Sequence, residues 1–234
     1  MKKIILAALA VITLTASMLF AQEAVKVTTA DKYEFAEGGM EVKVVTPKIH
    51  GLADTKLMNE LNKGFAKDAK EIIAEFETEA ADIKKENPGA DPHLGVYSDY
   101  VIKTDTKNYL AFDVYVGNSV GSSSSDHDFY TIDKRTRKLV TLKGLFKKNS
   151  NYVQVLSKYI KSEMERMNKK EGGMFWIKPT DSDAFKKIDK DQNFYIDSKD
   201  RLVICFDKYE VAAGAQGSPE FIIPAKIIKN ISAR

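Results

Sequence analysis

Apolar residues recur at helical spacing in two stretches of the chain. Between residues 55 and 85 they are separated by steps of three, four and seven positions, which places them on one stripe of a helix. Asp54 precedes this stretch as a capping residue, and Asn87-Pro88-Gly89 follows it as a stop signal. A second stripe covers residues 151–169. The pattern therefore predicts two long amphipathic helices.

Alternation of apolar and polar residues predicts the strands. Two such runs within residues 24–46 flank Glu37-Gly38-Gly39 and indicate a hairpin. Charged or polar turns separate three further pairs of runs, and one more run lies near the C-terminus. These runs are 95–104 with 109–116, 129–132 with 139–142, 194–196 with 202–206, and 221–224.

Strands interrupted by two long helices predict an α+β fold, with mainly antiparallel sheets packed against the two helices. A short helix carrying Phe185 and Ile188 is also expected over residues 181–188. We divide the chain into a signal peptide (1–21), an N-terminal α+β segment (22–120) and a C-terminal α+β segment (121–234). The last two are expected to form one compact unit, because their length is enough to bury a real core.

The N-terminus has the architecture of an export signal. Lys2 and Lys3 precede an apolar run over residues 4–14, and Ala21 is a small residue at which a peptidase can cut. We expect cleavage after Ala21 and an exported product, periplasmic or secreted. Since no cysteine lies near the cut, we expect no lipid anchor and no stable membrane anchor after cleavage.

Charge and cysteine content narrow the class further. The formal charge is only +3, and it falls when Lys2 and Lys3 leave with the signal, so nucleic acid is not expected as a partner. Cys205 is the single cysteine, which excludes an internal disulfide. Because Cys205 lies in an apolar run, we interpret it as a buried core residue.

Asp126-His127-Asp128 is the most suggestive local cluster for chemistry. A histidine beside carboxylates can act as a general base or a metal ligand, so an envelope hydrolase using His127 with Asp126 or Asp128 is the alternative function. In an extended segment, however, consecutive residues point to opposite faces. We therefore expect a loop-to-strand junction and assign no catalytic residue, no metal and no cofactor.

A partial calcium-loop pattern occurs near the C-terminal hairpin. Acidic and amide residues from Asp189 to Asp200 match several positions of that loop. Phe194 stands where the loop requires glycine, and the segment matches a strand, turn and strand better. A calcium-stabilised module is thus the third hypothesis.

Two loops rich in small residues are the candidate partner-binding regions. The first covers residues 117–128, and the second, after the strand that contains Cys205, covers residues 212–218. Small residues allow another surface to approach the backbone closely. The candidate contact residues are Ser122, Ser123, Asp126, His127, Tyr209, Ala213, Gly214 and Gln216.

Several motifs in the second half resemble a known family. They are Phe129-Tyr130-Thr131-Ile132-Asp133, Leu142-Lys143-Gly144-Leu145-Phe146, Asn193-Phe194-Tyr195-Ile196 and Tyr209-Glu210-Val211-Ala212. They are similar to the extracytoplasmic domain of the anti-sigma-V factor RsiV family, a domain of unknown function that also precedes the catalytic domains of some peptidoglycan deacetylases. The upstream segment, with Pro47-Lys48-Ile49, resembles the domain that usually comes before it.

This resemblance implies a non-enzymatic α+β module at the cell envelope. In the RsiV branch the domain binds lysozyme, so the implied ligand is a lysozyme-like protein or the peptidoglycan itself. The family's usual residues after the central strand are replaced here by Gly117-Asn118-Ser119-Val120-Gly121. We therefore expect a secreted or periplasmic binding module that contacts its ligand through the two loops.

Overall fold

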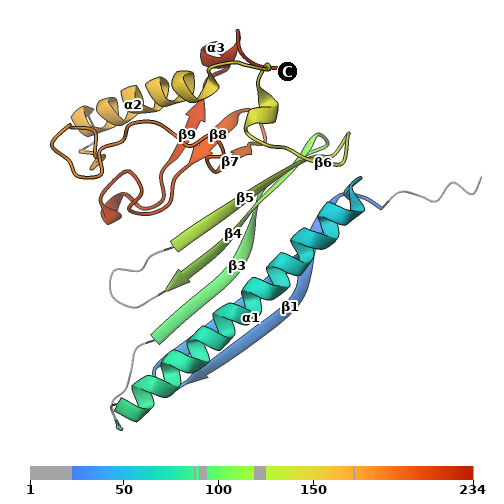
Figure 1. Cartoon of the computed structure of the whole chain (residues 1–234), viewed down its shortest axis with the longest axis vertical. Coiled ribbons are helices and arrows are strands. Elements are labelled where there is room, and N and C mark those ends of the chain that lie inside the picture. Colours follow the sequence, from blue (N-terminus) through green and yellow to red (C-terminus); the bar gives the residue numbers. More distant parts are fainter. Residues whose placement is uncertain (1–22, 87, 90–93, 119–124, 171, 234) are drawn as a thin grey trace, which may run out of the picture.

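A computed structural model describes residues 23–86, 88–89, 94–118, 125–170 and 172–233 (Figure 1). The predicted signal peptide and the residues Ser122 and Ser123 lie outside the described residues. The first layer is a six-stranded sheet with one long helix. Its elements are β1 (Lys26–Glu37), β2 (Met40–His50), α1 (Thr55–Glu86), β3 (Leu94–Asp105), β4 (Tyr109–Asn118), β5 (Ser125–Asp133) and β6 (Lys138–Leu139).

The strands of this sheet follow their order in the chain, from β1 to β6. All neighbours are antiparallel except β2 and β3, which run parallel with Val44 opposite Ser98. The parallel pair follows from α1, because a helix between two strands carries the chain back to the end where the first strand began. The predicted α+β class with mainly antiparallel strands is confirmed.

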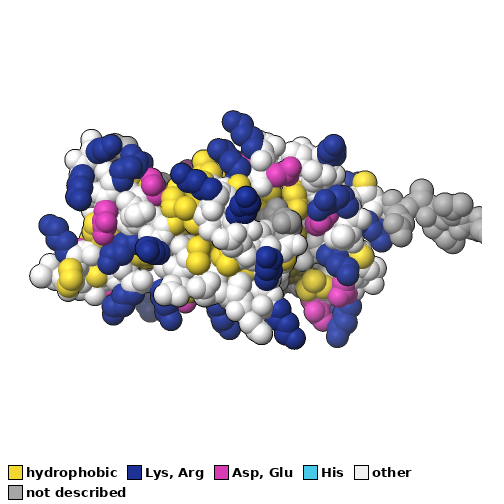
Figure 2. Space-filling view, turned by 90° about the horizontal axis from the view of Figure 1, so that it is seen from above, with side chains coloured by type: hydrophobic (Ala, Val, Ile, Leu, Met, Phe, Trp, Pro, Cys, Tyr) yellow, Lys and Arg dark blue, Asp and Glu magenta, His cyan; other side chains and the backbone are white. Residues whose placement is uncertain are grey.

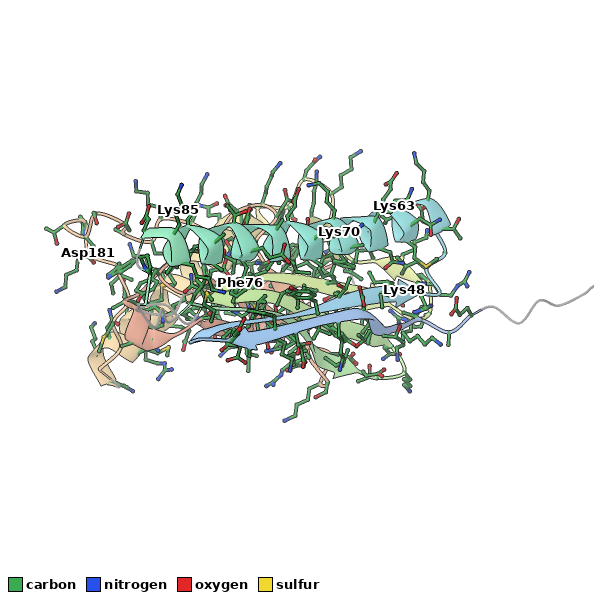
Figure 3. All side chains as sticks on the ribbon, turned by 90° about the horizontal axis from the view of Figure 1, so that it is seen from below. Lys48, Lys63, Lys70, Phe76, Lys85 and Asp181 are labelled. Carbon is green, nitrogen blue, oxygen red and sulfur yellow. The ribbon has the colours of Figure 1, made fainter. Side chains whose placement is uncertain are left out.

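Helix α1 lies along one face of the sheet (Figure 3). Its buried residues are Phe65, Ala69, Phe76 and Ala80. Phe76 lies on the side of the helix that faces the strands, whereas Lys63 and Lys85 lie on the exposed side (Figure 3). Asp54 caps the helix as predicted, since its Oδ1 accepts a hydrogen bond of 3.0 Å from the backbone N–H of Leu57.

The second layer is a three-stranded antiparallel sheet with its own helix. Its elements are α2 (Tyr152–Lys170), β7 (Phe194–Ile196), β8 (Leu202–Cys205), β9 (Glu220–Ile223) and α3 (Ala225–Ile228), with 3-10 turns at Lys143–Leu145 and Gly214–Gln216. Leu156, Ile160 and Met164 of α2 are fully buried in the largest core cluster. The predicted stripe of this helix thus identifies its packed face.

The short helix predicted over residues 181–188 is wrong. The segment is irregular, yet Phe185 and Ile188 are buried as expected. Its backbone is hydrogen-bonded to residues outside the segment. Phe185 N–H donates to the Trp176 carbonyl at 2.8 Å, and Ile188 N–H donates to Ser157 Oγ at 3.0 Å. These bonds replace the internal bonds that a helix would need.

A small apolar cluster joins the two layers. Phe129 on β5 stacks on Tyr195 of β7 with ring centroids 5.7 Å apart, and Ala111, Val203 and Cys205 pack beside them. Cys205 is buried and free, as predicted. Figure 2 views the end of the molecule that carries α2 and α3, where lysine and arginine side chains are scattered with acidic ones among them. In the described part of the chain, no helix has the length and apolarity needed to cross a bilayer.

Candidate functional site

Strand β5 separates two hollows in the molecular surface. Its even-numbered residues face α1, and its odd-numbered residues face away from that helix, because side chains alternate along a strand. Asp126 and Asp128 therefore line a cavity beside α1, which His127 also borders, and Ser125 lines a groove on the opposite face. The imidazole of His127 makes its hydrogen bonds with Asp113 and Ser125.

His127 is the centre of a hydrogen-bond cluster on the face away from α1. Its Nδ1 lies 2.9 Å from Asp113 Oδ2 on β4, and its Nε2 lies 3.0 Å from Ser125 Oγ. Ser218 Oγ, from the loop before β9, lies 3.4 Å from the same Nε2. The alternative hypothesis paired His127 with Asp126 or Asp128, but the carboxylate that holds the ring is Asp113 of the neighbouring strand.

The backbone of His127 is tied to the second layer. Its N–H donates to Asp207 Oδ1 at 3.1 Å, and its carbonyl accepts from Asn193 Nδ2 at 2.5 Å. Asn193 Oδ1 also accepts from the N–H of Phe129 at 3.5 Å. The side-chain amide of Asn193 thus hydrogen-bonds to the backbone of β5 as a neighbouring strand would. These bonds fix the position of the His127 backbone, and with it that of its ring.

The His127–Asp113 pair is buried. Only 17% of the His127 side chain and 8% of the Asp113 side chain is exposed. The hydrogen bond that Asp113 accepts from the imidazole raises the pKa of His127, against the opposing effect of burial. Asp113 Oδ1 is buried and receives no hydrogen bond within the described residues.

Ser125 opens onto a groove of about 540 Å³ on the sheet face away from α1. The rings of Tyr97 and Tyr115 line it, and the Tyr97 hydroxyl donates to Glu41 Oε2 at 3.1 Å. Burial, with the carboxylates of Asp99 and Asp113 nearby, raises the pKa of Tyr115. The remaining lining residues are Lys43, Ser98, Gly117, Asn118 and Lys208.

The cavity beside α1 holds about 240 Å³ and is acidic. Asp68, Asp126, Asp128 and Asp207 line it together with apolar residues such as Phe65. Burial, and then the charge of Asp68, raises the pKa of Asp128, and burial with Glu210 nearby raises that of Asp207 to about 6. Burial and neighbouring carboxylates thus disfavour the charged forms of Asp128 and Asp207.

The loop predicted to meet a partner is partly committed to internal contacts. Ala213 N–H donates to the Met174 carbonyl at 3.1 Å, and Gln216 Oε1 accepts from Met174 N–H at 3.3 Å. Tyr209 is 41% exposed and covers Gly214 so closely that a Cβ there would lie 2.3 Å from its ring. Tyr209 is thus the most accessible of these candidate contact residues.

The segment with the calcium-loop pattern forms the predicted β7–β8 hairpin. Asp197 pairs with Arg201 at 2.6 Å across the turn, and Asn193 is occupied by the backbone of β5. No group of three or more His, Cys, Asp or Glu in the described ranges is arranged to hold a metal ion.

Sequence reasoning missed Asp113, Ser125, Asn193 and Ser218 as partners of His127. One signal was present: Ser125 and His127 stand two residues apart in a strand, which puts them on one face. Asp113 stood in the strand predicted to pair next to it, but the register that brings them together is not readable from the sequence.

Two family models match the chain in succession. Residues 36–121 match the model described as Deacetylase PdaC, and residues 143–226 match the protein of unknown function DUF3298. Ser125 and His127 lie between the two matches. The fold resembles solved DUF3298 proteins from Bacteroides fragilis NCTC 9343 (TM-score 0.62, 15% identity, 91% of this chain and 95% of that one) and Pseudomonas aeruginosa PAO1 (0.54, 12%, 90% and 95%).

Fold and matched segments together define an α+β protein of the DUF3298 class with a PdaC-type segment in front. The chain is 36% identical to the anti-sigma-V factor RsiV of Bacillus subtilis strain 168 over 201 residues, which is 86% of this chain and 67% of that protein. This chain belongs to the RsiV family.

Proposed function

We propose that this chain is an exported binding module, periplasmic or secreted, that recognises a cell-wall glycan in the groove beside Ser125. The groove itself carries the proposal. It combines two tyrosine rings with acidic and basic side chains on a sheet face that α1 leaves uncovered. Membership of the RsiV family supports an extracytoplasmic ligand-recognition role, as does the export signal expected at the N-terminus.

The lining suits a sugar. A sugar ring has an apolar C–H face, which packs against an aromatic ring, and a rim of hydroxyls, which need donors and acceptors. Tyr97 and Tyr115 supply the rings, and Glu41, Asp99 and Lys43 supply polar groups around them. The bond between Tyr97 and Glu41 orders part of this surface before a ligand arrives, which lowers the entropic cost of binding.

A lysozyme-like protein is the second candidate ligand. Its contacts would come from the exposed Tyr209 and from Asp126, which lines the acidic cavity beside α1. A basic side chain of such a partner would be attracted by the four carboxylates of that cavity.

Co-sedimentation with purified peptidoglycan sacculi, beside a pull-down on immobilised lysozyme, tests the proposal. We expect retention by sacculi, with at least about tenfold weaker binding for Tyr97→Ala and Tyr115→Ala, because stacked aromatic side chains dominate such contacts. Tyr100→Ala is the matched control, since this tyrosine stands on the same strand with its side chain on the opposite face. Retention by lysozyme alone would move the ligand to the protein class, and retention by neither at micromolar concentration would refute both.

A further inference from the structure

We infer that Ser125, His127 and Asp113 form a hydrolytic triad that cleaves acyl esters presented in the groove. This activity goes beyond the binding role proposed above. The reaction class is serine-dependent ester hydrolysis, and the substrate is an ester of a small acyl group with an alcohol.

The three side chains stand in the order that this chemistry needs. Ser125 Oγ is 3.0 Å from His127 Nε2, and His127 Nδ1 is 2.9 Å from Asp113 Oδ2. Asp113 holds the ring in the tautomer whose Nε2 can take the serine proton. Strand geometry brings them together: Ser125 and His127 share one face of β5, and Asp113 is the diagonal neighbour of His127 on β4.

The cost of this arrangement argues against a purely structural role. A buried carboxylate normally receives several hydrogen bonds, because removing it from water is expensive. One carboxylate oxygen of Asp113 is hydrogen-bonded to His127. The other receives no hydrogen bond within the described part of the chain. Such incompletely satisfied buried groups are found at functional sites, where stability is given up for chemistry.

The nucleophile is placed where a substrate can reach it. Ser125 lines the groove, whereas His127 and Asp113 lie beneath the loops of the second layer.

The reaction balances without a co-reactant other than water. Ser125 Oγ bonds to the acyl carbon and gives its proton to His127 Nε2, which passes it to the departing alcohol as the C–O bond breaks. Water then attacks the acyl-serine and gives a proton to Nε2. That proton returns to Ser125 as the carboxylic acid leaves.

Labelling with a fluorophosphonate probe, together with hydrolysis of 4-nitrophenyl acetate, tests the triad in the purified protein. We expect one covalent adduct on Ser125, and at least about a 100-fold loss of both signals in Ser125→Ala. Ser198→Ala is the matched control, because Ser198 lies in the exposed β7–β8 turn. Asp113→Asn should lower the rate and shift the acidic limb of its pH profile to lower pH, which a structural role would not do.

Three results would overturn the inference. They are no adduct on the wild-type protein at pH 8, an adduct that persists in Ser125→Ala, and labelling that depends on Ser218 instead. A small ester needs no glycan contact, so this assay is independent of sacculus binding. Hydrolysis without sacculus binding would refute the glycan proposal alone, and binding without hydrolysis would refute the triad alone.

Discussion

His127 on β5 and Asp113 on β4 are joined by a hydrogen bond, with 2.9 Å between Nδ1 and Oδ2. The pair lies under the loops of the second layer, and the backbone of His127 is held there by Asp207 and Asn193. One histidine therefore links the groove to the contact between the two layers, and its protonation should be felt in the stability of the whole molecule.

Replacing Asp113 by Asn should destabilise the protein more in acid than in base. The pKa of His127 is raised in the folded state, so its stabilising contribution is complete below the unfolded value near 6.5 and is lost as the pH rises through the folded value. We expect a deficit of about 1 kcal/mol at pH 5.5 that narrows by pH 8.5. Urea unfolding at both pH values measures it. Asp99→Asn, a half-buried position in the groove, is the control, and equal deficits at both pH values would contradict the prediction.

Replacing Asp207 by Asn should stabilise the protein at neutral pH. The folded pKa of Asp207 is raised to about 6, so the ionised carboxylate becomes increasingly unfavourable as the pH rises from about 4 to above 6. Asn keeps an oxygen that can accept from the His127 N–H. We expect a gain of up to about 1 kcal/mol at pH 7.5 and little change at pH 4, allowing for partial exposure. Thermal or urea unfolding at the two pH values tests this, and a loss of stability at pH 7.5 would count against it.

Two glycines with positive φ should respond differently to alanine. Gly38 has φ +57° and open space around an added Cβ, whereas Gly51 has φ +74° and would place that Cβ 2.6 Å from the carbonyl oxygens of Glu23 and Ala24. Gly38→Ala should cost about 1 kcal/mol for the left-handed backbone alone. Gly51→Ala should cost at least about 1–3 kcal/mol more, because backbone must move. Chemical denaturation measures the loss of stability in each variant. Similar losses would show that the backbone at Glu23 and Ala24 moves without cost to make room for the added Cβ.

Cys205 should be unreactive in the native protein. Its side chain is buried, and burial raises the pKa of the thiol well above its usual value, so the nucleophilic thiolate is scarce. We expect labelling by a disulfide reagent such as DTNB to be at least about 100-fold slower in buffer than in denaturant. Rapid labelling in buffer would show that β8 opens locally without global unfolding.

The periodic parts of the chain were predictable because burial imposes a period. Leu156, Ile160 and Met164 stand on one stripe and are all fully buried, and the hairpin of β7 and β8 forms around its predicted turn. At Phe185, long-range hydrogen bonds replace the local ones of a helix. There the sequence pattern predicted that the side chain is buried, but not the backbone conformation. The parallel pairing of β2 with β3 also depends on tertiary packing.

The site was less predictable than the fold. Asp126-His127-Asp128 attracted attention because charged neighbours are conspicuous in a sequence, yet alternation along β5 separates them. Asp113 looked like an ordinary polar position within a strand. Only the register of β4 against β5, set by the burial of residues such as Phe112 and Ile132, makes it the partner of His127.

The parallel seam between β2 and β3 has a kinetic consequence. The 32 residues of α1, about 48 Å of helix at 1.5 Å per residue, separate the β1–β2 hairpin from the meander that begins at β3. The hairpin and the meander each form through short-range contacts, but their junction has high contact order and must await the closure of a long loop. We therefore expect the amides of β1 and β4 to gain protection from hydrogen exchange during refolding before those that bond across the seam.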